Sequence, residues 1–287
     1  MRLRSLRAPL TGLLLVLTGQ AASAGQITLP DPLPRAVEVD QATLEQLDPV
    51  TLSANFVDRV IHDLPVAAHL DRFRDLDATA LDAALDTRER RLAFWINIYN
   101  GYTQHFLKTD PSLYLEDRSA YFGLDQVAIA NDLVSLEDIE HGVLRRGATT
   151  YTLGHVRTLF LRRAFIQRFA VDTVDYRIHF ALNCGARSCP PVMPYTGTAV
   201  DDQLDAVSKF YLQQESRHDA DTDRVAVPRL LRWFSADFDG GSDAAKRAIL
   251  QRYGVIPKGV EPALDYREYD WTMVIRHYAY YQADSGR

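Results

Sequence analysis

The chain has 287 residues and a formal net charge of −6, with 47% hydrophobic and 24% charged residues. An acidic total argues against a nucleic-acid-binding protein, which needs clustered cations. The length fits one large domain or two small ones, and the apolar content can build a core without a scaffold of disulfides. Two cysteines in such a chain also exclude a small cystine-rich protein.

The first 24 residues are typical of a cleavable export signal. Three arginines within the first seven residues precede an apolar run from Leu10 to Leu17, and small residues end this segment at Ala24. The run is too short to span a bilayer, and no other segment has about 18 consecutive apolar residues, so we expect no membrane span. We therefore predict cleavage near Ala24 and a soluble mature protein that is periplasmic or secreted.

Residues 25–40 contain three prolines and are predicted to form an extended arm before a single globular domain from 41 to 287. No repeat or linker divides that domain. Residues 44–81 follow a mostly helical pattern that breaks at Pro65, and the next helix is predicted to start near Asp86, with Glu89 three residues on as in a capping box.

This next helix carries a stripe of amides among apolar residues. Asn97, Asn100 and Gln104 lie at helical spacing and form one stripe. Trp95, Tyr99 and other apolar residues surround them in the same segment. Asparagine is a poor helix former, so these amides need partners. They either tie down loops by hydrogen bonds to the backbone or orient a catalytic side chain or substrate.

The second half of the chain mixes short predicted strands with helices. Ser135 is predicted to cap a helix with Asp138, on which His141 lies one turn from Arg145. Further helices are predicted over 154–171, 201–214 and, capped by Ser242, up to residue 253; strands are predicted over 126–130, 177–183, 224–227 and 266–274. Helices outnumber strands without regular alternation, which predicts a helix-rich α+β domain with a small β-sheet.

The two cysteines follow the predicted strand 177–183, so the cysteine loop would lie at a strand end, with His179 and Asn183 on one face of the strand. A Cys184–Cys189 disulfide would be favoured by export. Alternatively, Cys184 is a catalytic thiol with His179, His141 or His105 as its base, or the pair cycles between dithiol and disulfide.

Common catalytic signatures are absent from the sequence. There is no G-x-S-x-G, P-loop, G-x-G-x-x-G or H-E-x-x-H motif, and residues 237–241 resemble a calcium loop only superficially and are interpreted as a turn. The C-x4-C spacing with scattered histidines is not a recognised ligand pattern, so we predict neither a metal nor a cofactor.

Three segments together resemble the family named domain of unknown function 547: LAFWINIYNGYTQH (92–105), LVSLEDIEHGVLR (133–145) and RIHFALNCGARSCPPV (177–192), with the weaker WFSADF (233–238) in the expected order. The resemblance spans about 80 to 240. It implies no settled activity, although domains resembling this family occur beside glutaredoxin-like modules, which hints at thiol chemistry. The family pattern marks Trp95, Asn97, Tyr99, Asn100, His141, Arg145, His179, Cys184, Cys189 and Pro190.

Our leading hypothesis from the sequence is an exported thiol-dependent hydrolase or acyl transferase acting on a small-molecule or peptide substrate. Cys184 would be the nucleophile, His179 or His141 the base, and Asn97 or Asn100 the orienting group or oxyanion donor. Trp95, Tyr99 and Arg145 are candidate substrate-binding residues. The alternatives are a non-enzymatic exported domain with a structural Cys184–Cys189 disulfide and a thiol–disulfide redox protein.

Overall fold

The computed structural model describes residue 27 and residues 40–148, 153–155 and 164–279. Three predicted segments lie wholly or partly outside these described residues. They are the signal segment, the arm except for residues 27 and 40, and residues 156–163 of the helix expected over 154–171. The statements below concern the described residues.

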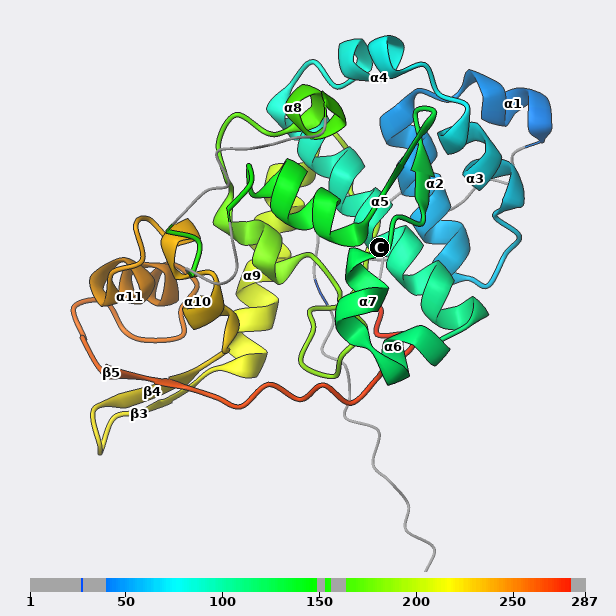
Figure 1. Ribbon diagram of the computed structural model, residues 1–287. Coiled ribbons are helices and arrows are strands. Elements are labelled where there is room, and N and C mark those ends of the chain that lie inside the picture. Colours follow the sequence, from blue (N-terminus) through cyan, green and yellow to red (C-terminus); the bar gives the residue numbers. More distant parts are fainter. Residues whose placement is uncertain (1–26, 28–39, 149–152, 156–163, 280–287) are drawn as a thin grey trace, which may run out of the picture.

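The amino-terminal half gathers helices around the long central helix α5 (Figure 1). The helix α2 packs along α5, and α9 from later in the chain also contacts it. Gly101 makes the first approach possible, because a Cβ atom there would collide with the ring of Phe56 on α2. The helices of this half are α1 (Gln41–Gln46), α2 (Pro49–Ile61), α3 (Ala67–Arg74), α4 (Ala78–Ala84), α5 (Arg88–Thr109), α6 (Ser112–Glu116) and α7 (Arg118–Gly123).

Local sequence signals explain where several of these helices begin. Asp48 accepts hydrogen bonds from two N–H groups in the first turn of α2, and Thr87 accepts one from Arg90 N at the start of α5. The predicted start near Asp86 is therefore one to two residues early. The break expected at Pro65 is confirmed, because α2 ends at Ile61 and α3 starts at Ala67.

A hairpin and a π-helical turn follow α7. The strands β1 (Val127–Ile129) and β2 (Asp132–Val134) pair antiparallel, and η1 (Asp138–Leu144) packs against α5. Ser135 Oγ accepts from Asp138 N at 3.0 Å while an Asp138 carboxylate oxygen accepts from Ser135 N at 3.2 Å, which confirms the predicted capping box. The helix α8 (Ala164–Phe169) packs against η1.

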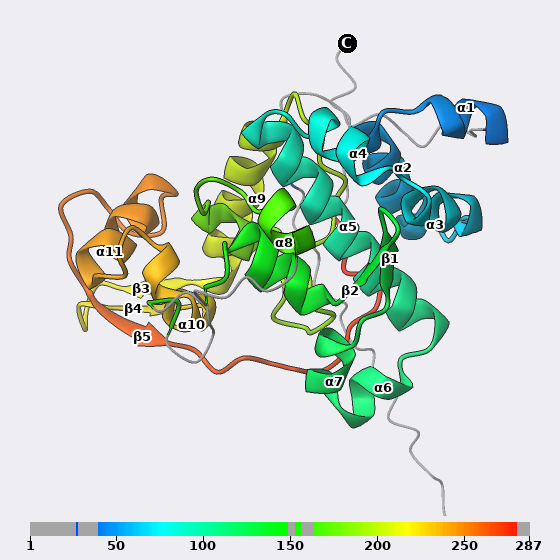
Figure 2. The ribbon, with the colours of Figure 1, turned by 45° about the horizontal axis from the view of Figure 1, so that its top comes forward.

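The carboxy-terminal half builds a second, smaller core at one end of the molecule (Figure 2). In the three-stranded sheet, β4 pairs antiparallel with β3 and parallel with β5. Phe180, Tyr211 and Phe238 meet in this core beside the sheet residues. The elements are η2 (Tyr176–Phe180), α9 (Val200–Glu215), β3 (Arg217–Asp219), β4 (Arg224–Val227), α10 (Leu230–Trp233), η3 (Ser235–Asp237), α11 (Asp243–Arg252) and β5 (Ala263–Tyr266).

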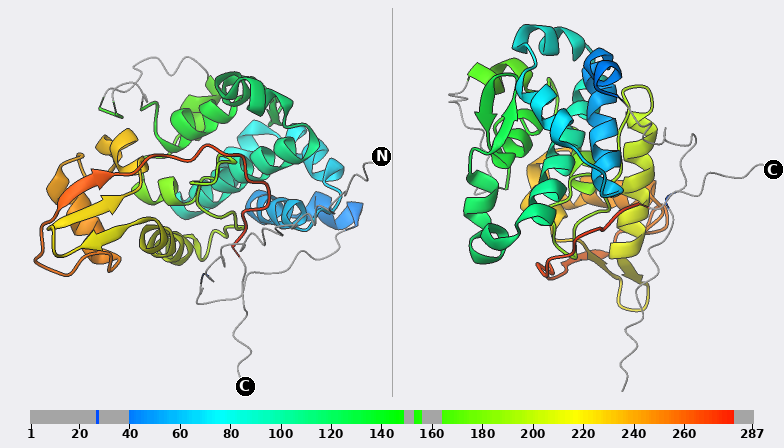
Figure 3. Two further views of the ribbon diagram at one scale, coloured as in Figure 1. Left: turned by 90° about the horizontal axis from the view of Figure 1, so that it is seen from below. Right: turned by 90° about the vertical axis from the view of Figure 1, so that its right-hand side faces the viewer.

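After β5 the chain runs back beneath the molecule as a C-terminal strap, which we define as residues 267–279 (Figure 3, left). The strap is held against the cysteine loop by backbone hydrogen bonds. Arg187 N donates to Thr272 O at 2.8 Å, Val274 N donates to Gly185 O at 2.8 Å, and Val192 N donates to His277 O at 2.8 Å. The last part of the chain thus covers the segment that carries both cysteines.

The helix-rich α+β class with small sheets is confirmed, and so are the elements predicted over 126–130, 201–214, 224–227 and after Ser242. The strand predicted over 177–183 is wrong, because residues 176–180 form the 3₁₀ helix η2, which Asp175 caps through Arg177 N. The cysteine loop therefore follows a helical turn and not a strand end. A short apolar run does not distinguish a buried strand from a buried helical turn.

The strand predicted over 266–274 is also wrong beyond its first residue. The strand β5 ends at Tyr266, opposite Val227, because Pro228 has no N–H with which β4 could continue the ladder. The strap then pairs with a loop through single bridges such as Ala186 with Met273. None of the helices within the described residues is long and apolar enough to cross a membrane.

Candidate active site around the cysteine loop

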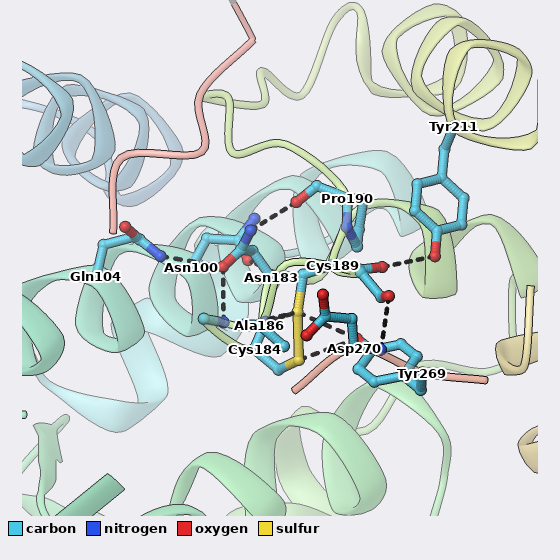
Figure 4. The surroundings of a disulfide bond; sticks show 12 residues. Asn100, Gln104, Asn183, Cys184, Ala186, Cys189, Pro190, Tyr211, Tyr269 and Asp270 are labelled. Carbon is cyan, nitrogen blue, oxygen red and sulfur yellow. Dashed lines mark hydrogen bonds between the residues drawn. A yellow bond between two sulfur atoms is a disulfide. The ribbon is translucent and has the colours of Figure 1, made fainter. Parts of the chain in front are cut away.

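The two cysteines are joined in a disulfide, with their Cα atoms 6.0 Å apart (Figure 4). Five residues separate them in sequence, so the bond closes a small loop. The two sides of the bond differ in exposure, because Cys189 is 1% exposed whereas Cys184 is half-buried.

Amide side chains from α5 hold this loop in place. Asn100 Nδ2 donates to Ala181 O at 2.9 Å, and its Oδ1 accepts from Asn183 N at 2.8 Å. Gln104 Nε2 donates to Asn183 Oδ1 at 3.0 Å, and Asn183 Nδ2 in turn donates to Pro190 O at 2.6 Å (Figure 4). These residues are almost fully buried, so each lost bond would leave a polar group without solvent.

Asn97 braces the backbone at Tyr195, six residues after the loop. Its Nδ2 donates to Tyr195 O at 2.8 Å and to Ser53 Oγ at 3.0 Å, and its Oδ1 accepts from Tyr195 N at 2.8 Å. The structure thus has Asn97 and Asn100 in the backbone-bracing arrangement, one of the two alternatives that the sequence left open.

The buried sulfur sits among hydrogen-bond donors. Cys189 Sγ accepts from Cys184 N at 3.0 Å and from Ala186 N at 3.3 Å. The hydroxyl of Tyr269, on the C-terminal strap, lies 3.2 Å from the sulfur of Cys189 and 3.2 Å from that of Cys184. Burial raises the pKa of Tyr269 far above its ordinary value, so the hydroxyl keeps its proton and remains a donor.

A cavity of about 320 Å³ opens beside the exposed side of the disulfide. Cys184 lines it and Cys189 does not. Its wall is largely aromatic, with a few ionisable groups, which is typical of a small-molecule site. The lining residues are Tyr99, Phe122, Glu137, Glu140, His141, His179, Leu182, Cys184, Pro190, Leu230, Trp233, Phe234, Tyr269 and Trp271.

A buried network of charges backs the cavity. His179 Nε2 contacts Asp237 Oδ2 at 2.9 Å, and Arg145 Nε donates to the same oxygen at 2.6 Å. Arg145 Nη1 also lies 3.0 Å from His141 Nδ1. A guanidinium can only donate, so this nitrogen of His141 accepts and its proton is on Nε2.

His179 is held as a neutral imidazole. Burial lowers its pKa, which outweighs the hydrogen bond to Asp237, and its ring stacks on Phe234 at 4.0 Å between centroids. Because the carboxylate accepts from Nε2, the neutral ring has Nδ1 as its proton acceptor. Burial alone would raise the pKa of Asp237, but the hydrogen bond from His179 and the charge of Arg145 bring it below its ordinary value.

The carboxylate of Glu140 also lines this cavity. The pKa of the Tyr99 hydroxyl is raised first by burial and then by the charge of that carboxylate. Glu140 is also 3.8 Å from His141 Nδ1. The site therefore combines a disulfide, two histidines and a carboxylate around one cavity.

The structure separates the predicted site residues into two groups. Tyr99, His141, His179 and Cys184 line the cavity together. The others lie behind or beyond it: Asn97 and Asn100 brace loops, Arg145 is fully buried against Asp237, Cys189 is the buried half of the disulfide, and Trp95 packs in the main core against Phe165 and Phe169. His105 lines a different surface depression beside Lys108.

Sequence reasoning missed three residues of this site. Asp237 belongs to the WFSADF segment that carried the weak part of the resemblance, but it was assigned only to a turn. Glu140 lies beside His141 in the DIEHG motif and offered a direct signal. Tyr269 offered none, because only the path of the strap brings it to the sulfurs.

No group of three or more metal-ligating side chains is found among residues 40–148, 153–155 and 164–279. The disulfide also occupies the two thiolates that a metal would use first.

The fold and site define a helix-rich α+β domain with a disulfide at the edge of an aromatic cavity. Residues 83–212 match the model of one family, described as "Protein of unknown function, DUF547". This match confirms the family resemblance over residues 83–212, a range that holds the three main motif segments, whereas the weaker WFSADF segment (233–238) lies outside it. Neither the curated proteins nor the solved structures gave a match.

Proposed function

We propose that this protein performs thiol–disulfide exchange at the Cys184–Cys189 bond, with a thiol substrate that enters the cavity. One observation carries the proposal: the bond is asymmetric, with Cys184 facing the cavity and Cys189 buried among three hydrogen-bond donors. Attack in the cavity then expels the sulfur whose thiolate is best stabilised. Exchange is faster when the leaving thiol has a low pKa.

The atoms balance in two steps. The thiolate R–S⁻ attacks Cys184 Sγ, an R–S–Cys184 bond forms, the Cys184–Cys189 bond breaks, and Cys189 leaves as a thiolate. A second thiolate then attacks the substrate sulfur of the mixed disulfide, which releases R–S–S–R and leaves Cys184 reduced. Two substrate thiols are oxidised and one protein disulfide is reduced, and the reverse direction uses the same steps.

Proton transfer falls to groups already in the cavity. A thiol must lose its proton before it attacks, and the neutral His179 has an acceptor nitrogen as well as a carboxylate, Asp237, that stabilises the imidazolium. The two N–H groups and the Tyr269 hydroxyl hold the departing Cys189 thiolate, so its protonation is not required for the bond to break.

We also propose export, on the pattern of residues 1–24 alone. An oxidising extracytoplasmic compartment would keep the pair as a disulfide at rest. Amino-terminal sequencing of the protein recovered from the extracytoplasmic fraction should begin near Gly25. Recovery of the full-length chain in the cytoplasm would contradict this proposal.

A thiol-dependent hydrolase or acyl transferase is the second candidate. It is favoured by the presence of Cys184, His179 and His141 in one cavity. It requires the reduced protein, however, and the amides of Asn97 and Asn100 are engaged by backbone groups and are not free to bind an oxyanion. Hydrolysis of activated thioesters only after reduction, with loss in Cys184→Ser, would support this candidate.

Trapping the mixed disulfide tests the exchange mechanism. In Cys189→Ser the remaining Cys184 should form a stable mixed disulfide with an added small disulfide such as cystamine, detected by intact-protein mass. In the matched variant Cys184→Ser, the buried Cys189 should react at least about tenfold more slowly, because its sulfur is shielded from solvent.

The wild-type protein supplies the decisive comparison. Its disulfide should equilibrate with millimolar cysteamine while circular dichroism shows the fold intact. A bond that yields only when the protein is unfolded would overturn the proposal in favour of a structural disulfide. Faster trapping at Cys189 than at Cys184 would overturn the direction of attack.

A further inference from the structure

Among the described ionisable groups that line the cavity, acidic side chains are not matched by lysine or arginine. Its described lining contains two carboxylates, Glu137 and Glu140, and two histidines, but no lysine or arginine. Within the described part of the chain, no arginine or lysine forms an ion pair with either glutamate. The neighbouring Arg145 is matched by Asp237 at 2.6 Å and lies behind the wall. The ion-pairing groups of the described lining therefore contribute net negative charge, and low-dielectric walls strengthen its field.

The aromatic wall also favours a positively charged ligand. Trp233, Tyr269 and Trp271 form a cluster with ring centroids 4.7 to 5.9 Å apart. Ring faces attract cations, and the protein already uses this: the Arg118 guanidinium lies 4.7 Å from the centroid of Trp271, although Arg118 does not line the cavity. Tyr269 is also the residue that contacts both sulfurs.

We infer that the cavity selects a small aminothiol, a low-molecular-mass thiol with a positive charge near its sulfur, as the partner of the Cys184–Cys189 disulfide. The reaction in this inference rests on the proposed function, whereas the preference for a cation belongs to the cavity itself. The volume of about 320 Å³ suits a molecule of this size. Cys184, at the wall, places the reacting sulfur within reach of the same cavity.

The charge arrangement explains the expected selectivity. An aminothiol that loses its thiol proton keeps its ammonium group, which the two glutamates and the ring faces attract while the thiolate meets Cys184. A carboxylate-bearing thiol would bring a second negative charge toward Glu137 and Glu140. One attraction or repulsion at such a partly solvated site changes a rate by about three- to tenfold.

Three thiols of similar size and different charge test the inference: cysteamine, 2-mercaptoethanol and 3-mercaptopropionate. The rate at which each reduces the protein disulfide is divided by its rate with a small reference disulfide, which corrects for thiol pKa and nucleophilicity. The corrected rates should fall in the order cationic, neutral, anionic. The differences among the three corrected rates should shrink as the salt concentration is raised from 20 to 500 mM, because added salt screens the charge interaction between thiol and cavity.

Charge-removing variants locate the selectivity. The double variant Glu137→Gln/Glu140→Gln should lose most of the preference for cysteamine, measured as the ratio of the corrected cysteamine rate to the corrected 2-mercaptoethanol rate, so that a change common to both thiols cancels. Glu116→Gln, an exposed carboxylate outside the lining, removes a charge as a matched control and should keep the preference. Equal corrected rates for the three thiols in the wild type, or the same loss of preference in Glu116→Gln, would overturn the inference.

A binding measurement separates this inference from the proposed function. Ethylammonium chloride, which has no thiol, is titrated against the oxidised protein with sodium chloride as the control, and the fluorescence of the cavity tryptophans is followed. Binding that the double variant loses would support the cationic cavity even if no thiol reduces the disulfide, in which case only the proposed function fails. Exchange with all three thiols but no ethylammonium binding would overturn the inference and leave the proposed function standing.

Discussion

The hydroxyl of Tyr269 is expected to stabilise the Cys189 thiolate, and Tyr269→Phe removes only that hydroxyl. It lies 3.2 Å from each sulfur in the oxidised protein. A hydrogen bond to a charged group contributes about 1.5–3 kcal/mol. Sulfur is a weak acceptor and the hydroxyl is shared, so we take the low end, about 1.5 kcal/mol.

That energy translates into two measurable shifts. The pKa of Cys189 in the reduced protein should rise by about one unit, because 1.36 kcal/mol corresponds to one unit. Above that pKa, the reduction potential of the pair should fall by about 30 mV, since 1.4 kcal/mol equals 30 mV for two electrons. The sign follows from the loss of a donor, which destabilises the thiolate and so disfavours the reduced state.

The assay is the pH dependence of alkylation at Cys189, followed by peptide mass, together with redox titration against a dithiol buffer. Phenylalanine keeps the ring contacts with Trp233 and Trp271, so the fold should survive. Tyr211→Phe is the matched control, because its hydroxyl donates to Ser188 O at 2.8 Å in the same loop and not to either sulfur. A Cys189 pKa that is unchanged in Tyr269→Phe, or raised equally in Tyr211→Phe, would refute the reasoning.

Three further predictions concern stability. Burial lowers the pKa of His69 from 6.5 to about 4, so between these pH values the unfolded chain binds more protons than the folded one. The unfolding free energy should therefore fall by about 3 kcal/mol as pH drops from 6.5 to 4. Urea titrations of His69→Gln should show a flatter pH dependence, and an equally steep one would count against the assignment. Asp237→Asn should lower the unfolding free energy by about 3–5 kcal/mol, because it leaves the buried Arg145 guanidinium uncompensated. The exposed Asp265→Asn should lower it by under about 1 kcal/mol in the same denaturant assay. Similar losses in the two variants would contradict the burial argument. Gly185 has φ +80° and no room for a Cβ atom beside α5, so Gly185→Ala should lower the unfolding free energy by about 2–4 kcal/mol. The loss should be clearly larger than in Gly240→Ala, where φ is +83° but the space around the Cβ position is open. Equal losses in thermal melts would remove the steric part of the explanation.

The sequence predicted local features well and the site only in part. The caps at Ser135 and Ser242 were readable because they depend on residues a few positions apart. The motifs located His141, His179 and Cys184, which the structure brings to one cavity. The strand predicted over 177–183 was wrong because a short, fully buried apolar run carries no periodicity that distinguishes a helical turn from a strand.

The functions of the amides could not be assigned without partners. Asn97 and Asn100 were correctly singled out as side chains that need hydrogen bonds, but their partners Tyr195 and Ala181 lie 81 to 98 residues away in sequence. Trp95 looked like a binding residue from its motif, yet it is fully buried against α8. A conspicuous residue type indicates that a contact exists and does not say with what.

By itself, the sequence determined the family resemblance, the helix-rich class and the pair of cysteines on which the proposed chemistry rests. Only the tertiary structure decided that the pair is bonded, that Cys184 faces a cavity while Cys189 is buried, and that Tyr269 and Asp237 belong to the site. These facts depend on the return of the C-terminal strap to the cysteine loop and of η3 to His179 on η2, across 58 to 85 residues of chain. Such long-range packing is set by the burial of apolar surface over the whole domain, and no local pattern encodes it.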